Sequence, residues 1–390
     1  MQYDLQKSLL TDLKIGKKTG FKKPSSWRDI RKNVPDNCIR LFVDERYPIG
    51  FVATVTDGYS VDIDGEHYAD CNSEAQFSMA DWSEYTATDG YDISYPTGAS
   101  KAHIIDIYPQ TTGNNITAFK CQRVAASGVE QQGILWAHFN TTQKISCAEM
   151  FGTISTLRNT LLTAVTAKDN KLFFNSIYIA FYGCSSLEYL ADLVGDGSNK
   201  SFEYAFSGCS NLEKITLSNT VVSAMLNTFS SCTKLTEIKT KNASANITAA
   251  NTSNAYADCR ALKNIIPTAY TSNVTNMTTF ITNAISLQDT IFDVRNATGL
   301  AKIGCYGNSS YFISGLKGLR VSSSAPFSGS EPQIDVSYTG MDRTALVTLF
   351  NDLPTVTDGQ ILNITACTGS SDLTADDKAI ATDKGWTVTL

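Results

Sequence analysis

Hydrophobic residues between positions 180 and 290 recur with a period of about 25 residues. The leucines at 187, 212, 235, 262 and 287 are separated by 25, 23, 27 and 25 residues. An aromatic residue lies six positions before each of the first four leucines, and a cysteine lies three positions before each of them. A period of this length predicts a solenoid, in which each unit buries its apolar side against its neighbours.

Each unit divides into two predicted elements. A turn or short helical segment ends at the Phe-x-x-Cys phrase, and a strand then opens on the leucine. The predicted strands are 212–217, 235–238 and 262–266. Phe280 to Leu287 is a degenerate copy of the repeat unit, and a further copy that flanks the repeats is indicated around Phe151. Because neighbouring strands lie about 4.8 Å apart, six or so coils predict a parallel sheet roughly 25–30 Å long.

The pattern changes on both sides of the repeats. Before them, short alternating strands are predicted at 39–43, 50–55, 59–65, 103–109 and 133–139, which indicates a small sandwich or barrel. After them, Asp342 to Leu353 carries an apolar stripe at helical spacing, and Thr374 to Asp377 caps a second helix. Strands are predicted at 361–365 and 386–390.

These patterns predict an α+β protein with four parts. Residues 1–24 form a basic anchoring arm, and residues 25–145 form a β-rich attachment domain. Residues 146–320 form the solenoid with its parallel sheet, and residues 321–390 form an α/β cap that closes the open end of the core.

Charge is unevenly distributed along the chain. Residues 1–40 carry ten Lys or Arg against four acids, whereas residues 41–100 carry one Arg against twelve acids. This asymmetry suggests electrostatic docking of the basic arm to a partner, or a solvated tail. The net charge of −6 argues against a nucleic-acid surface.

The ten cysteines do not suggest a disulfide framework. Cys184, Cys209, Cys232 and Cys259 share one repeat position, so we expect a stacked column of reduced, buried side chains. The sequence has no Cys-x-x-Cys pair, and its three histidines lie outside the repeats. A zinc site is therefore not expected. Asn-x-Ser/Thr triplets, such as those at Asn115, Asn246 and Asn273, are interpreted as accidents of composition.

The repeat unit A-F-x-G-C-S-x-L-E is clearest in residues 180–188 and 205–213. It resembles the BspA-type leucine-rich repeats of bacterial surface proteins, and residues 271–278 resemble the SNVTNM phrase of a related surface-protein repeat. The resemblance covers roughly residues 150–320. The sequence departs from the family pattern at Ala284, which replaces the repeat cysteine. It implies a binding solenoid but assigns no binding residues.

The C-terminal phrase of residues 373–388 is similar to endings of tail-fibre-like proteins from phages that infect gut Bacteroidetes. Together the two resemblances imply a phage virion protein that carries a repeat of the kind found on host surfaces.

Signatures of catalysis are missing from the sequence. It contains no nucleophile elbow, phosphate loop, dinucleotide fingerprint or zinc-binding HExxH, so no catalytic residue, metal ligand or cofactor is assigned and no enzyme is expected. Asp62, Asp64 and Glu66 leave three interpretations open: a Ca²⁺ site, the carboxylates of a glycosidase, or a solvated acidic face, which we favour. Whether the acidic segment 57–92 binds a metal ion stays open.

The candidate binding residues fall in two groups. The strand face of the solenoid offers Glu188, Glu213, Lys214, Thr216, Glu237 and Lys239. A polar loop in the N-terminal domain adds Trp82 and Tyr85, as contacts for a sugar or a protein.

The preferred hypothesis is a phage virion structural protein of tail-fibre or receptor-binding type. Residues 1–145 would bind other virion proteins, and the repeats would bind a host-surface protein or glycan, in a homo-oligomer. The sequence has no apolar run typical of a signal peptide or a membrane span. We therefore expect synthesis in the host cytoplasm and incorporation into the virion, without membrane insertion. A capsid or head decoration protein and a bacterial BspA-like surface adhesin are the alternatives.

Overall fold

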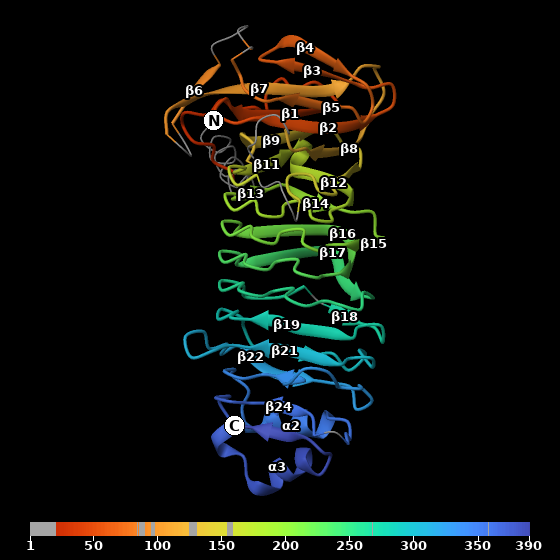
Figure 1. Ribbon diagram of the computed structural model, residues 1–390, viewed down its shortest axis with the longest axis vertical. Coiled ribbons are helices and arrows are strands. Elements are labelled where there is room, and N and C mark those ends of the chain that lie inside the picture. Colours follow the sequence, from red (N-terminus) through yellow and green to blue (C-terminus); the bar gives the residue numbers. More distant parts are fainter. Residues whose placement is uncertain are drawn as a thin grey trace, which may run out of the picture.

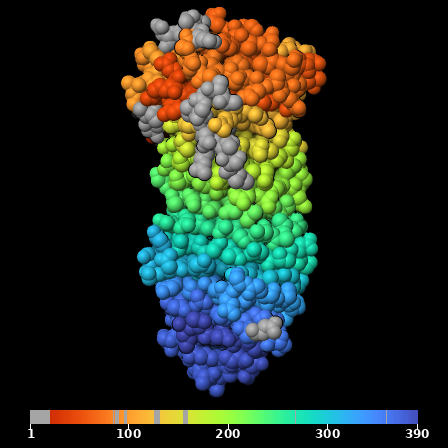
Figure 2. Space-filling view, in the orientation of Figure 1, coloured from red at the N-terminus to blue at the C-terminus, as the bar shows by residue number. Residues whose placement is uncertain are grey.

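The computed structural model describes residues 21–83, 85, 90–94, 98–124, 131–153, 159–266, 268–357 and 359–390. The first 20 residues of the predicted basic arm lie outside the described residues. The described chain forms an elongated stack of β-coils, with the N-terminal strands at one end and the C-terminal helices at the other (Figure 1, Figure 2).

Two large sheets build the N-terminal half of the stack. In the first, the strands lie in the order β13-β11-β9-β1-β7-β3-β4, with β6 beside β7. Their bounds are Cys38–Asp44 (β1), Tyr59–Ile63 (β3), Glu66–Cys71 (β4), Tyr91–Ile93 (β6), Ser100–Pro109 (β7), Ile134–Asn140 (β9), Ala164–Ala167 (β11) and Tyr189–Leu190 (β13). The strands predicted near 39–43, 59–65, 103–109 and 133–139 are confirmed as β1, β3, β7 and β9.

The second sheet has the order β18-β17-β16-β14-β12-β10-β8-β2-β5, with β15 beside β16. Its strands are Ile49–Val55 (β2), Gln76–Met79 (β5), Ile116–Cys121 (β8), Ile145–Ser146 (β10), Lys171–Ser176 (β12), Asp192–Val194 (β14), Asn199–Ser201 (β15), Lys214–Ala224 (β16), Glu237–Ile247 (β17) and Thr268–Tyr270 (β18). The predicted strand at 50–55 is confirmed as β2.

Both sheets change from antiparallel to parallel pairing at corresponding points. In the first sheet, β9 pairs antiparallel with β1 and parallel with β11. In the second, β8 pairs antiparallel with β2 and parallel with β10. The N-terminal strands therefore continue directly into the sheets of the solenoid. One hydrophobic cluster accordingly extends from Ile39 to Trp386.

Turns, rather than helices, precede each repeat leucine. Within each turn segment, alternate backbone N–H groups donate to the next coil: Phe181 to Ala205 O, Phe206 to Thr228 O and Phe229 to Ala255 O, over 2.8–3.0 Å. Glycine at 183 and 208 has a φ of 72° and 81°, a left-handed conformation that glycine adopts without steric cost. This intercoil ladder excludes a helix, so the predicted α+β class is corrected to a mostly-β solenoid.

The repeat aromatics form a continuous column inside the stack. Ring centroids of successive coils are 5.5–5.8 Å apart from Phe151 through Phe280. Phe119 on β8 extends the column, 6.1 Å from Phe151. The flanking copy predicted around Phe151 is thereby confirmed, and the aromatic column connects the N-terminal strands to the repeats.

A cysteine column accompanies the aromatic one. The thiols of Cys209, Cys232 and Cys259 donate to the carbonyl oxygens of Phe181, Phe206 and Phe229 in the preceding coil, over 2.9–3.1 Å. All ten cysteines are free, and all except Cys71 are buried. The predicted stacked column is confirmed, and each of these three thiols contributes a hydrogen bond to an otherwise apolar core.

Several Asn-x-Ser/Thr triplets have a structural role that composition did not reveal. The side-chain oxygens of Asn276 and Asn363 accept from the N–H and hydroxyl groups two residues later, over 2.7–3.1 Å. Asp335 makes the same pair of bonds with Ser337. These Asx turns fix the chain at the start of β19 and at the ends of β23 and β24. That the triplets arose from composition, and not as glycosylation sites, stays a prediction.

The remaining strands continue the stack to the C-terminus. They are Asn276–Thr282 (β19), Lys302–Tyr306 (β21), Ile334–Asp335 (β23), Ile361–Asn363 (β24) and Thr387–Thr389 (β25) in one parallel sheet, with Thr290–Asp293 (β20) and Leu316–Arg320 (β22) in another. Two predicted helices are confirmed as α2 (Arg343–Asp352) and α3 (Ala375–Thr382), with the predicted Thr374 capping box. The Lys384 ammonium donates to three carbonyl oxygens at the end of α2, over 2.7–3.0 Å. This contact satisfies carbonyls that the helix leaves without a partner.

One strand prediction in the repeats is wrong. Residues 262–266 form no strand, although Lys263 N still donates to Thr236 O across 3.2 Å. The N–H of Ile266 donates to the Tyr256 hydroxyl instead, and Pro267 has no N–H to offer. Regular strand pairing resumes at β18.

Burial of the cysteines predicts selective thiol chemistry. We expect a disulfide reagent to modify Cys71 alone in the folded protein and all ten thiols in denaturant, because burial raises the pKa of the core thiols and blocks access. Mass spectrometry after native labelling counts the modified sites. A Cys71→Ser variant should lose native labelling, and rapid labelling of Cys209 or Cys232 would contradict the buried column.

His138 predicts a pH dependence of stability. It is 5% exposed on β9, where its Nδ1 and the Trp136 Nε1 both hydrogen-bond the Thr166 hydroxyl. Burial, with the nearby charges of Arg31 and Arg40, lowers the pKa of His138 to about 4. The unfolded chain binds this proton near pH 6.5 while the folded chain does not, so stability is complete above pH 6.5 and falls toward pH 4.

We expect a loss on the order of 3 kcal/mol across this window, measured by urea unfolding at pH 7, 6, 5 and 4. A His138→Gln variant should show a flatter profile. Asp377, whose pKa Arg343 lowers to about 2, loses its contribution mainly below pH 4 and so adds little to the change within this window. An unchanged slope in the variant would contradict the assignment.

Candidate binding surface

The two large sheets differ in what covers their outward faces. Residues 21–31 lie against the first sheet, where the Phe21 ring is 4.9 Å from that of Trp136, and Trp27 and Ile30 are buried. The second sheet carries alternating buried and solvent-facing side chains. On β16, for example, Ile215 and Leu217 are buried, whereas Lys214 is exposed.

The register of β16 and β17 brings four predicted site residues together. Lys214 is paired with Glu237, and Thr216 with Lys239, so their side chains lie on one face. The Lys239 ammonium is 3.7 Å from the Glu237 carboxylate. Both side chains are well exposed, so the ion pair contributes little to stability and its groups remain available to a ligand.

Two shallow grooves cross this face. One, of about 400 Å³, is lined by Lys214, Thr236, Glu237, Lys263, Asn264 and Gln288. The other, of about 290 Å³, is lined by Lys171, Phe173, Asp192, Val194, Thr216, Ser218, Asn219, Lys241 and Asn242. The grooves therefore contain three of the predicted residues, Lys214, Thr216 and Glu237.

Glu188 and Glu213, which the sequence also predicted as binding residues, do not lie with Lys214, Thr216 and Glu237. Both are exposed, but Glu188 directly precedes β13 in the first sheet, and Glu213 directly precedes β16. Neither residue lines either groove. Each of these glutamates directly follows a repeat leucine and precedes the strand, so neither belongs to the part of the strand face that the grooves cross.

Sequence reasoning missed Phe173 and Lys241 in the second groove. Leu172 and Phe174 are buried on β12, and Phe173 between them faces outward and is half-buried. The alternation Lys-Leu-Phe-Phe-Asn was the available signal. Two adjacent phenylalanines conceal it, because only pairing with β14 decides which ring faces the core.

The loop residues Trp82 and Tyr85 require a correction. Trp82 is 8% exposed, stacks on the His103 ring at 4.5 Å, and donates from Nε1 to Tyr47 O. Tyr85 meets the same imidazole edge-on at 5.2 Å, and its hydroxyl donates to Ile63 O. Packing against the imidazole therefore buries the Trp82 indole that the sequence assigned to a ligand, whereas Tyr85 stays partly exposed.

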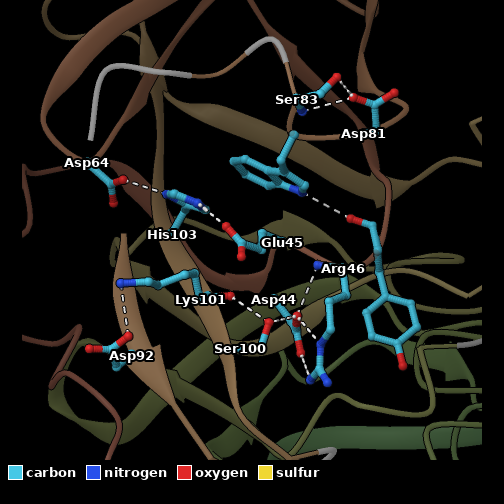
Figure 3. Close-up of polar contacts among 12 residues, drawn as sticks. Asp44, Glu45, Arg46, Asp64, Asp81, Ser83, Asp92, Ser100, Lys101 and His103 are labelled. Atoms are coloured by element: carbon cyan, nitrogen blue, oxygen red, sulfur yellow. Dashed lines mark hydrogen bonds and ion pairs between the residues drawn. The ribbon is translucent and has the colours of Figure 1, made fainter. Parts of the chain in front are cut away.

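His103 is held between two carboxylates (Figure 3). Its Nδ1 is 2.7 Å from Asp64 Oδ2, and its Nε2 is 3.3 Å from Glu45 Oε2. Asp64 also accepts from the N–H of Ile104, and its side chain is only 3% exposed. With both ring nitrogens bonded and the ring stacked, this cluster fixes the β3–β4 hairpin and offers no free base.

The acidic residues of this hairpin therefore do not form one solvated face. Asp64 has a buried carboxylate, Glu66 is exposed, and Asp62 accepts from the Tyr108 hydroxyl and lies 3.1 Å from His67. Asp64 and Gly65 have positive φ values of 54° and 91°, which turn the chain and direct the Asp64 carboxylate to His103. Among the described residues, no group of three or more His, Cys, Asp or Glu side chains is arranged to hold a metal ion.

Residues 155–283 match the family model of the BspA type leucine rich repeat region, in six copies. These repeats are similar to BspA-type leucine-rich repeats. The match confirms the resemblance drawn from the repeat phrase, and it covers every residue that lines the two grooves except Gln288. No curated protein and no solved structure matches the chain. In the described part of the chain, no helix combines the length and the apolar character that a membrane crossing requires.

The His103 cluster generates a prediction about stability. We expect His103→Ala to lower the free energy of unfolding by about 2–4 kcal/mol, because it leaves the Asp64 carboxylate buried without this partner. Denaturant unfolding followed by tryptophan fluorescence measures this loss. His67→Ala is the matched control, since its side chain is 54% exposed and its removal should change stability by less than about 0.5 kcal/mol. Equal effects in both variants would contradict the structural role of His103.

Proposed function

We propose that this chain is a non-catalytic binding and structural protein whose repeat stack presents the outward face of β12, β14, β16 and β17 to a partner. The observation that carries the proposal is the contrast between the two faces. Residues 21–31 pack on the first sheet and leave one groove, beside Arg28 and Arg40. The second sheet is not covered by such a segment among the described residues, and it exposes grooves along its length, two of them over β12 to β17. A continuous core holds these strands in fixed register, which suits recognition over an extended surface.

In its finer form, the proposal is a phage virion protein of tail-fibre or receptor-binding type. Residues 1–145 would attach to other virion proteins, and the grooved face would bind a host-surface protein or glycan, in a homo-oligomer. Support comes from the C-terminal phrase at 373–388 and from the basic and acidic blocks of the first 100 residues. A capsid decoration protein would use the same attachment region.

The repeat family favours a second candidate. BspA-type repeats over residues 155–283 fit an adhesin-like protein of the bacterial surface. This adhesin would use the same outward face of β12, β14, β16 and β17, called the grooved face. It differs from the virion protein in being located on the bacterial surface.

Immunogold labelling with an antibody to residues 146–320 separates these candidates. We expect gold on phage particles, and its position distinguishes a tail fibre from a capsid decoration. Gold on bacterial envelopes free of particles would overturn the virion proposal and support the surface adhesin.

A binding assay tests the grooved face itself. We expect the Lys214→Glu, Lys239→Glu double variant to bind intact host cells at least ten-fold more weakly than the wild-type chain, because it reverses two exposed charges on this face. Lys317→Glu is the matched control, since this exposed lysine on β22 lies outside both grooves. Thermal unfolding should be unchanged in all three proteins. Equal binding by the double variant and the control would place the binding surface elsewhere.

A further inference from the structure

The second groove combines an apolar floor with a ring of polar side chains. One line of paired residues crosses it: Phe173 on β12, Val194 on β14, Ser218 on β16 and Lys241 on β17. These positions span three strand spacings, roughly 14 Å. The line begins at a half-buried aromatic ring and ends at an exposed ammonium group. The groove is therefore long enough for a short oligosaccharide and has distinct ends.

Hydrogen-bonding groups surround this line without being used by the protein. Asp192 and Thr216 lie on one side of it, and Asn242 lies beside Lys241. Among the described residues, these four side chains make no ion pair or side-chain hydrogen bond with one another or with neighbours. Carboxylate, hydroxyl, carboxamide and ammonium groups are thus free to bond a ligand that carries many hydroxyl groups.

The backbone beneath the groove is not available to a ligand. At Leu217 and Ser218, β16 pairs with β14 on one side and with β17 on the other, so neither side of the strand is open to a further strand. A bound peptide could not add a strand here, and its own backbone groups would have few partners. A sugar needs none of these bonds, because its ring face packs on an aromatic side chain and its hydroxyls bond side chains.

The charge of the groove selects among sugars. Lys171 and Lys241 line it against a single carboxylate, Asp192, so the groove carries a net positive charge. Lys171 is paired with Asp192 in the sheet, which leaves Lys241 at the far end as the cation without a neighbouring acid on β16. A carboxylate on the ligand would complement this end.

We propose that this groove binds an acidic oligosaccharide, with one sugar ring over Phe173 and Val194 and a carboxylate at Lys241. The assignment rests on the proposed binding function and names the chemical class of its partner. Asp192 and Thr216 bond ring hydroxyls between these two ends, and Asn242 supports the carboxylate.

The test uses the purified full chain and immobilised oligosaccharides. The probes are a panel of uronic-acid-containing tetrasaccharides, with cellotetraose as the neutral reference. Calorimetry then measures the affinity of the chain for each sugar that retains it. We expect the wild-type chain to bind at least one acidic probe and to bind cellotetraose at least ten-fold more weakly. Lys241→Gln should weaken binding of the acidic probe at least ten-fold while leaving the weak neutral binding unchanged.

Phe173→Ala should abolish binding of both probes, and its thermal unfolding is compared with wild type because Phe173 is half-buried. Lys317→Gln and Ile291→Ala are the matched controls, since Lys317 is exposed and Ile291 is 65% exposed, and both lie on strands outside the groove. The proposal would be overturned if no acidic probe retained the chain. An equal loss of binding in Lys241→Gln and Lys317→Gln would also overturn it.

Binding to intact host cells separates this proposal from the proposed function. If the chain binds cells, and Lys241→Gln binds them equally well while protease treatment of the cells removes binding, the partner is a protein and only the saccharide proposal fails. If neither wild-type nor variant chain binds any cell surface, the proposed function fails as well.

Discussion

The distance between hydrogen-bonded coils is the constraint on which the rest of the structure depends. Backbone ladders hold neighbouring coils about 4.8 Å apart. An aromatic ring at one repeat position can then contact the same position in the next coil, and the observed centroid distances of 5.5–5.8 Å reflect this. The same spacing lets the thiols of Cys209, Cys232 and Cys259 reach a carbonyl of the preceding coil. Side chains at the same position of successive repeats therefore contact one another, or the backbone of the neighbouring coil, along the stack.

A stack of this kind must also end, because an open coil exposes both apolar side chains and unpaired backbone groups. At the N-terminal end, the change to antiparallel pairing places β4 and β5 at the sheet edges. β4 carries exposed Glu66 and Asp70, charges that oppose edge-to-edge association. At the other end, α2 and α3 cover the core, and Arg343 and Lys384 connect these helices through a carboxylate and helix-end carbonyls.

The polar groups of the molecule divide between two tasks. In the N-terminal strands, Asp64, His103 and Glu45 bond one another beneath Trp82, so their polarity is used in holding a hairpin and a loop. On the second sheet, Lys241, Asn242 and Thr216 lie in a groove and bond no neighbouring side chain among the described residues. Residue types that look alike in sequence therefore differ in what they can offer a partner, and burial decides which set is available.

The sequence by itself determined the solenoid, its period and its buried columns, because every repeat position has the same neighbours in each coil. It also determined the C-terminal helices, since the apolar stripe before Pro354 and the Thr374 capping box are local signals. Only the tertiary structure decided which ring of Phe173 and Phe174 faces solvent, that Trp82 is buried on His103, and that residues 262–266 form no strand. Each of these depends on pairing or packing with residues distant in sequence, which no local pattern encodes.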